Sequence, residues 1–266
     1  MEKIPPRIDN DAYSPEVMAI RVENAGIAKA KLGFIQTFTL AILAGCFIAL
    51  GAAFYTIVIT ESGLGFGPAK LLGGIAFSLG LILVIVGGAE LFTGNNLIIM
   101  AWADGKVSHR QLLRNWGIVY VGNFVGSIFI ALLVALSGIL EFKSGAVGTT
   151  AVTIADSKIS LTFEEAFFRG ILCNILVCLA VWLCFSARTV AGKIAALLFP
   201  ISAFVALGFE HSVANMYLLP VGYLAGSEHV TSLGLLMNLL PVTLGNIVGG
   251  SGFVALTYWL VYLRNK

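Results

Sequence analysis

The sequence has 266 residues, of which 58% are hydrophobic and 11% charged, and its mean hydropathy is +0.95. This composition is far more apolar than that of a water-soluble domain and indicates an integral membrane protein. The formal net charge of +2 is too small to indicate a nucleic-acid partner. The cysteines lie in apolar runs without metal-type spacing, so we expect reduced core residues, no metal and no cofactor: Cys46, Cys173, Cys178 and Cys184.

The first 31 residues differ in composition from the rest of the chain. Residues 1–13 are polar and lack an apolar h-region, so we expect no cleaved signal peptide. Ser14-Pro15 is typical of a helix start, and the amphipathic segment that follows extends to about Lys31. We expect this helix to lie on the membrane surface, to plug a pore entrance or simply to lead into the first span. The predicted organisation is a cytoplasmic tail and helix (1–31) followed by a transmembrane domain (32–266).

Charge-free runs of about 20 residues or more predict six transmembrane spans in an all-α protein. Four of these runs are uninterrupted: 32–60, 115–140, 170–187 and 235–263. Pro241 should kink the last span or mark its first turns. The second span (71–103) is interrupted at Glu90 and the fifth (194–222) at Glu210-His211, so both are predicted to be broken helices. Twelve lysines and arginines fall on the side of the termini and four on the other, which predicts cytoplasmic termini.

Two motif pairs recur in the same order in the two halves of the chain. Gly88-Ala89-Glu90 with Asn95 matches Gly208-Phe209-Glu210 with Asn215, and the Gly-Asn-x-Val-Gly run 122–126 matches 245–249. Because each half holds three spans, the second copy must run upside down. Inverted repeats with helices broken near the midplane are the construction of channels and transporters.

The fifth-span break contains His211, the side chain best able to exchange a proton near neutral pH. An ionisable group in a membrane segment normally marks a pathway for ions or protons. A small weak-acid anion could hydrogen-bond to His211 and cross protonated, or pass as an anion. Alternatively, His211 is a structural residue bonded to a neighbouring helix. Thr93, beside the first break, offers a second hydrogen-bonding group.

Other polar residues have plainer interpretations. Glu90 and Glu210 should satisfy the amides freed at each break. Asn174 could bond the break loop or His211, or join helices. Lys158, in a predicted external loop 153–158, could attract anions or be merely solvated. Thr162 with Glu165 predicts a capping box at the start of the fourth span.

Four stretches resemble the formate/nitrite transporter family, and most closely its formate channels: Glu90 to Asn96, Gly170 to Trp182, Gly208 to Met216 and Pro241 to Asn246. The resemblance covers nearly the whole chain. It implies an aquaporin-like fold, a homopentamer with one pore per protomer in a bacterial inner membrane, and passage of formate and related small monovalent anions. It also implies that the N-terminal helix takes part in gating.

Site residues follow from the resemblance by position. His211 and Thr93 correspond to the central pair, Asn174 to the family's amide and Lys158 to its entrance lysine. Two constrictions are implied, one at Phe77, Leu81 and Phe204 and the other at Leu91, Phe92 and Val177.

Three alternatives remain open at this point. Gly94-Asn95-Asn96 is more similar to nitrite and hydrosulfide members of the family, so the substrate is not fixed. An intramembrane hydrolase using His211 and Ser251 would need a different pattern, because 249–253 lacks the Gly-x-Ser-x-Gly elbow. A water or glycerol channel would not need a titratable group, and the breaks lack Asn-Pro-Ala boxes. We therefore expect a channel and not an enzyme.

Overall fold

The computed structural model describes residues 11–264, and this part of the chain is helical without strands. In chain order the helices are α1 (Pro15–Lys31), α2 (Phe34–Ile59), α3 (Phe66–Gly87), α4 (Phe92–Asn95), η1 (Asn96–Ile98), α5 (Ile99–Ala103), α6 (His109–Leu136), η2 (Ile139–Glu141), α7 (Ala146–Ile159), α8 (Phe163–Ser186), α9 (Val190–Ala206), α10 (Ser212–Leu224), α11 (Ser232–Ile247), the π-helical η3 (Val248–Leu256) and α12 (Thr257–Tyr262).

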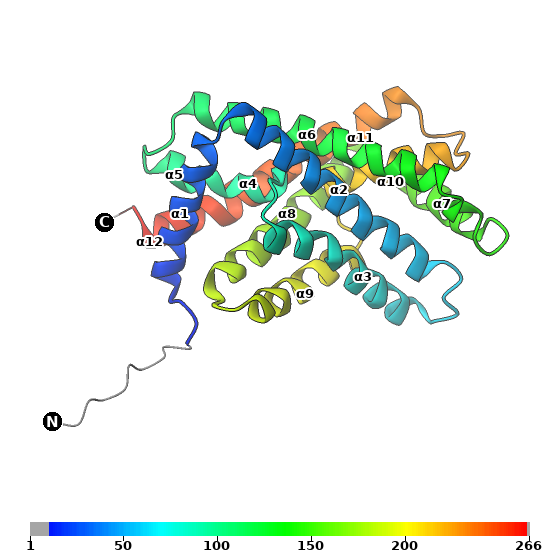
Figure 1. Cartoon of the computed structure of the whole chain (residues 1–266), viewed down its shortest axis with the longest axis horizontal. Helices are drawn as coiled ribbons and strands as arrows, with labels where there is room; N and C mark the ends of the chain where they lie inside the picture. The colour runs from blue at the N-terminus through cyan, green and yellow to red at the C-terminus, as the bar shows by residue number, and fades with distance from the viewer. Residues whose placement is uncertain (1–10, 265–266) are drawn as a thin grey trace.

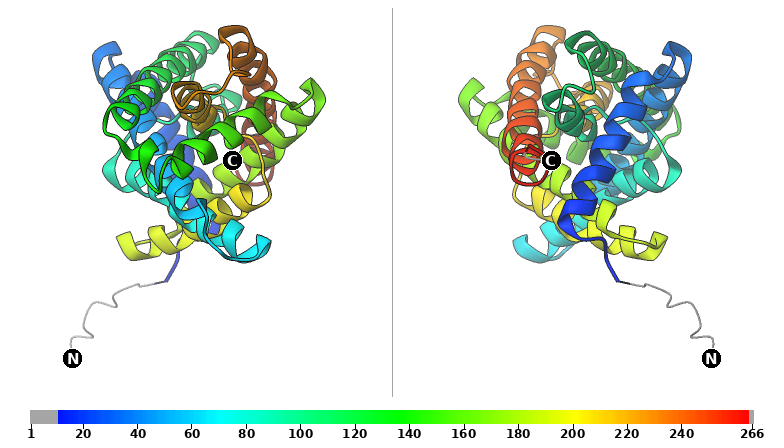
Figure 2. Two further views of the ribbon diagram at one scale, coloured as in Figure 1. Left: turned by 90° about the vertical axis from the view of Figure 1, so that its right-hand side faces the viewer. Right: turned by 90° about the vertical axis from the view of Figure 1, so that its left-hand side faces the viewer.

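Five of these helical segments are long and apolar enough to cross a membrane. They are α2, α3, α6, α8 and the continuous run from Ser232 to Tyr262. Less than half of the most apolar window of α2, α3 or α6 is buried in the chain, so their outer faces are available to lipid or to other subunits. Together the helices form a bundle in which segments run side by side (Figure 2). The chain is therefore a multi-pass, all-helical membrane protein.

The spans are predicted from charge-free runs, but some helices extend past charged residues, so their boundaries differ from the predicted ones. α6 begins at His109, six residues earlier than predicted, because Ser108 and Gln111 form a capping box there. The predicted capping box of Thr162 and Glu165 is present at the start of α8. Pro241 lies inside α11, well after its first turn.

Residues 146–159 correct one prediction, because they form the helix α7 and not an external loop. Val147, Ala151 and Ala155 recur at four-residue intervals and are buried. This face packs on α10, where a Cβ at Gly222 would overlap the side chain of Ala155. Figure 1 shows α7 and α1 at opposite ends of the molecule.

The two predicted interruptions coincide with helix ends. α3 stops at Gly87, and Gly88 adopts a left-handed φ of 79° before α4 begins at Phe92. α9 stops at Ala206, and Gly208 adopts φ 70° before α10 begins at Ser212. A left-handed residue after a helix end costs glycine no steric strain, which explains the glycine in each break.

The amphipathic helix α1 packs against the helical bundle. Its buried residues Met18, Ala19 and Val22 join a core cluster with residues of η1, α5 and α8. Residues 1–10 of the predicted polar tail lie outside the described part of the chain. This packing differs from that of an independent helix on the membrane surface.

An ionic cluster also anchors α1. Lys106 Nζ lies 2.7 Å from Glu23 Oε2 and 2.8 Å from Asp104 Oδ2, and the Trp259 indole N–H donates to Asp104 Oδ1 at 3.2 Å. Burial raises the pKa of the Glu23 carboxyl, whereas the hydrogen bond from Lys106 lowers the pKa of Asp104. The cluster thereby ties α1 to the turn before α6 and to α12.

Small residues allow α2 and α6 to approach closely. A Cβ at Gly126 would overlap the carbonyl oxygen of Ile42, and a Cβ at Gly45 would overlap the carbonyl of Asn123. Such contacts between backbones drive helix packing in membranes, where no hydrophobic effect operates between helices.

We expect Gly126→Ala to lower stability by about 1–3 kcal/mol, because the added methyl must push α2 and α6 apart. The thermal unfolding midpoint of the detergent-solubilised protein measures this change. Gly117→Ala in the same helix is the matched control, because its Cβ would meet nothing within 4 Å. It should be neutral or stabilising by about 0.5–1 kcal/mol. Equal effects of the two variants would contradict the close approach.

Candidate functional site

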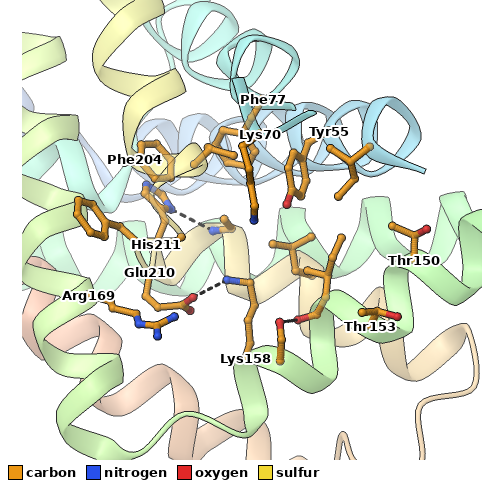
Figure 3. A pocket seen from close by; sticks show the side chains of 18 of the residues that line it. Tyr55, Lys70, Phe77, Thr150, Thr153, Lys158, Arg169, Phe204, Glu210 and His211 are labelled. Carbon is orange, nitrogen blue, oxygen red and sulfur yellow. Dashed lines mark hydrogen bonds and ion pairs between the residues drawn. The ribbon is translucent and has the colours of Figure 1, made fainter. Parts of the chain in front are cut away.

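Two chambers approach each other from opposite sides of the chain's centre. The first, which we call the His211 chamber, has a volume of about 440 Å³ and contains Lys70, Lys158, Arg169, Glu210 and His211 (Figure 3). The second, the Lys29 chamber, has a volume of about 320 Å³ and contains Arg21, Lys29, Glu90 and Lys193. The floor of each chamber is apolar.

Apolar side chains separate the chambers. At the end of the His211 chamber the rings of Phe77 and Phe204 meet edge to face, with centroids 5.5 Å apart. The His211 ring stacks on Phe204 at 5.8 Å. Leu81 and Leu91, both 2% exposed, line the Lys29 chamber. Leu81 thus shares a chamber with Leu91, whereas the resemblance grouped it with Phe77 and Phe204.

His211 lines the His211 chamber and forms hydrogen bonds through both nitrogens of its ring. It is the N-cap of α10, where Nδ1 accepts a hydrogen bond from the Ala214 N–H at 3.0 Å. Its Nε2 lies 3.0 Å from Thr93 Oγ1. Because an amide can only donate, Nδ1 carries no hydrogen in this arrangement, so the hydrogen of the neutral ring is on Nε2. Nε2 therefore donates to Thr93, and the Thr93 hydroxyl hydrogen is free for another acceptor.

Asn174 holds the segment that carries Thr93. Its amide donates to the carbonyl oxygens of Thr93 at 3.3 Å and Asn246 at 2.7 Å, and the Cys178 thiol donates to the same Thr93 carbonyl at 3.4 Å. Of the interpretations open for Asn174, two are present: it bonds the segment after the first break through Thr93, and it joins α8 to α11 through Asn246. Its contact with His211 is therefore indirect, through Thr93.

Two of the expected constriction residues lie elsewhere. The Phe92 ring packs edge to face on Trp116 and Tyr120 of α6, with centroids 6.1 and 5.0 Å apart. Val177 is 1% exposed, and neither it nor Phe92 lines one of the two chambers.

Asparagines satisfy the backbone freed at each break. Asn123 Oδ1 accepts from the Phe92 N–H at 2.9 Å, and its amide donates to the carbonyls of Ala41 and Glu90. Asn246 does the same for the Ser212 N–H, at 2.9 Å, and for the carbonyls of Gly170 and Glu210. The expectation that Glu90 and Glu210 satisfy these amides is therefore wrong.

The two glutamates instead bind lysines. Glu90 Oε1 lies 2.6 Å from Lys29 Nζ, and its Oε2 accepts from the Asn95 amide at 2.7 Å. Glu210 Oε1 lies 2.8 Å from Lys158 Nζ, and its Oε2 accepts from the Asn215 amide at 2.6 Å. Each carboxylate is buried and paired, as a charge at this depth requires.

A second asparagine closes each network. Asn115 accepts from Asn95 and donates to the Lys29 carbonyl, whereas Asn238 accepts from Asn215 and donates to the Lys158 carbonyl. Asn115 and Asn238 stand eight residues before Asn123 and Asn246 in the sequence. Extending the repeated motif upstream would have found these two asparagines.

The hydrolase alternative fails on geometry. The Ser251 hydroxyl donates to Asn96 Oδ1 at 3.0 Å, while both ring nitrogens of His211 are engaged by Thr93 and Ala214. Without a hydrogen bond between serine and histidine, the base cannot activate the nucleophile.

We expect Lys158→Met to destabilise the protein by about 3–5 kcal/mol, because it leaves the buried Glu210 carboxylate unpaired. The double variant with Glu210→Gln should recover most of this loss, which thermal unfolding of the purified protein measures. Lys143→Met is the matched control: Lys143 pairs with Glu61 at 3.3 Å, but both side chains are about 60% exposed, so the cost should be below about 1 kcal/mol. No recovery in the double variant would contradict this account.

Comparison with known proteins identifies the family and agrees with the all-helical fold. Residues 16–260 match the family model for the formate/nitrite transporter. The chain is 44% identical to the formate channel FocA of Escherichia coli K12, over 96% of each chain, and 41% identical to FocA of Haemophilus influenzae, over 92% of this chain and 93% of the other.

A solved pentameric formate channel with formate bound superposes with a TM-score of 0.80 at 43% identity, covering 87% of this chain and 98% of the other. An ion channel of the same family superposes with a TM-score of 0.83 at 31% identity, covering 92% of this chain and 98% of the other. The chain belongs to the formate/nitrite transporter family, whose members are channels and transporters and not enzymes.

Proposed function

We propose that this protein is a homopentameric channel for formate and related small monovalent anions. The observation that carries the proposal is the His211–Thr93 hydrogen bond, the polar point between two basic chambers. Relatives that are formate channels, at 41–44% identity, support the substrate, and a solved pentameric relative supports the assembly. Each protomer would contain its own pore within the lipid bilayer.

We further propose six spans arranged as two inverted three-helix repeats with an aquaporin-like fold, in which α3 with α4–α5 and α9 with α10 form the broken spans. The paired hydrogen-bond networks around Glu90 and Glu210 support this reading. In this scheme residues 1–31 form a cytoplasmic tail and helix, and residues 32–266 form the channel in a bacterial inner membrane. Both termini would then be cytoplasmic, so that the Lys29 chamber opens inward and the His211 chamber opens outward.

In the proposed pathway Lys158 stands at the outer entrance, and Thr93, His211 and Asn174 form the centre. Phe77 and Phe204 would constrict the outer side, and Leu81 and Leu91 the inner side. Phe92 and Val177 would support the inner constriction from behind. An anion entering the apolar slit loses its hydration at a cost of several kcal/mol. The hydroxyl of Thr93, whose hydrogen is free while its oxygen accepts from His211 Nε2, could replace part of that hydration by a hydrogen bond to the anion.

Proton coupling through His211 would require a local rearrangement. The imidazolium has hydrogens on both nitrogens, so Nδ1 would have to release the Ala214 N–H before the ring accepts a proton. We propose that an arriving anion stabilises the charged ring and compensates for this lost hydrogen bond. Formate could then accept the proton and cross the second constriction neutral.

Nitrite and hydrosulfide remain alternative substrates within the family. The Asn95 and Asn96 side chains that motivated them bind Glu90 and the Phe92 carbonyl, respectively. They therefore have structural partners, and the sequence difference at these positions needs no difference in substrate.

Flux into proteoliposomes, measured for formate, nitrite, hydrosulfide and chloride at two pH values, tests the proposal. Formate should pass faster than chloride. Thr93→Val and His211→Asn should each reduce formate flux about tenfold or more, because the first removes the hydroxyl that donates to a desolvated anion and the second removes the ring N–H that orients this hydroxyl. His211→Asn should also abolish the dependence on pH.

Thr93→Ser is the matched control, since it keeps the hydroxyl and should retain most of the flux. Absence of flux for every small anion would overturn the channel. A pH dependence that survives in His211→Asn would overturn proton coupling through the ring.

A further inference from the structure

The His211 chamber has more positive charge than its ion pair uses. Lys70 from α3, Lys158 from α7 and Arg169 from α8 line it, together with one carboxylate, Glu210. Lys158 neutralises Glu210 at 2.8 Å. Within residues 11–264, Lys70 and Arg169 have no carboxylate within ion-pair distance. Outside the chamber, Arg169 has the exposed Glu165 as an electrostatic neighbour, and Lys70 Nζ lies 5.7 Å from the centroid of the Phe66 ring. Inside the chamber, Glu210 is the one carboxylate of the lining and Lys158 already pairs with it.

The three cations enter the chamber from different directions. In Figure 3 the Lys70 ammonium points down between Tyr55 and Lys158, and the Arg169 guanidinium lies on the far side of Glu210. Three separate helices supply these cations, so they do not belong to one flexible segment. The arrangement offers two separated positions for negative charge, one near Lys70 and one near Arg169.

The Lys29 chamber has the same number of cations and carboxylates, but its arginine is held differently. Its arginine, Arg21, stacks on the Tyr13 ring with Cζ 4.0 Å from the ring centroid. The Arg188 guanidinium contacts the same Tyr13 ring, with its Cζ 4.1 Å from the ring centroid. Arg21 is thus held by an aromatic contact, whereas the Arg169 fork has no such partner and is available to a ligand.

We propose that the His211 chamber is a binding site for a dicarboxylate such as succinate, which occupies the chamber without crossing and so competes with formate. One carboxylate would accept hydrogen bonds from the Arg169 fork, and the other would bind Lys70 and Lys158. A volume of about 440 Å³ is within the range of pockets that enclose small organic ligands. The edge-to-face rings of Phe77 and Phe204 would prevent the dicarboxylate from leaving the chamber toward the other side. A dianion would also lose more hydration free energy at these rings than formate.

Binding is tested first, without transport. Isothermal titration of the detergent-solubilised protein with sodium succinate at constant ionic strength should give saturable binding. Arg169→Gln should weaken it about tenfold, as expected for loss of a charge-assisted, two-pronged hydrogen bond. Arg169→Lys keeps the charge but not the two-pronged geometry, so its affinity for succinate should fall between those of the wild type and Arg169→Gln. It is the test variant if Arg169→Gln does not fold. Lys143→Gln, an external lysine outside the chamber, is the matched control and should bind like the wild type.

Competition is tested second, and this arm rests on the proposed function. Succinate present on both sides of the proteoliposomes should inhibit formate flux, whereas propionate, with one carboxylate, should inhibit far less at the same concentration. Inhibition is expressed relative to each variant's own uninhibited flux, and Arg169→Gln should need about ten times more succinate.

The two arms separate the possible failures. Succinate binding that is unchanged in Arg169→Gln, or no stronger than that of propionate, would overturn the dicarboxylate site even if formate flux is normal. Arg169-dependent binding in a protein that passes no formate would support the site and overturn the channel.

Discussion

A helix that stops inside a membrane exposes backbone groups that water cannot reach, and this constraint organises the whole molecule. Each unsatisfied group costs several kcal/mol in hydrocarbon. One asparagine meets the need at each break: Asn123 and Asn246 each accept one backbone N–H and donate to two carbonyls, on two different segments. A neutral amide can do both tasks, which a carboxylate cannot. The break loops are therefore fixed to the surrounding helices, and the residues they carry are fixed with them.

A charged layer surrounds each of these amide contacts. Glu90 and Glu210 are buried, yet each is paired with a lysine from a helix outside the break and with the side-chain amide of the asparagine five residues later. Removing either partner would leave an unpaired charge at low dielectric, which is far costlier than losing the pair together. The same interactions line the chambers with polar groups up to the apolar barrier. Support of the fold and formation of the pathway are thus achieved by the same side chains.

The breaks could be predicted because polar residues within apolar runs are conspicuous and recur in both halves. The repeated motif contains Asn123 and Asn246 but does not reveal that they satisfy the freed backbone, a task expected of Glu90 and Glu210 from the sequence. What the pattern misses depends on contacts between distant segments. Residues 153–158, predicted as a loop, belong to α7, whose sequence is short, rich in threonine and only moderately apolar. Lys29 lies in an amphipathic helix, where a lysine normally faces water. The direction of the Phe92 ring depends on the first turn after the break, and no spacing rule specifies that turn.

The two chambers also share a simple electrical property. Each contains three cations and one carboxylate, a formal net charge of +2 at both mouths. An anion arriving from either side therefore meets an attractive field of similar strength. The formal charge of the two chamber linings therefore favours neither direction of flow. The direction of net flow would then be determined by the concentration gradient and the membrane potential, so that the same pore could export an anion or import it as those gradients change.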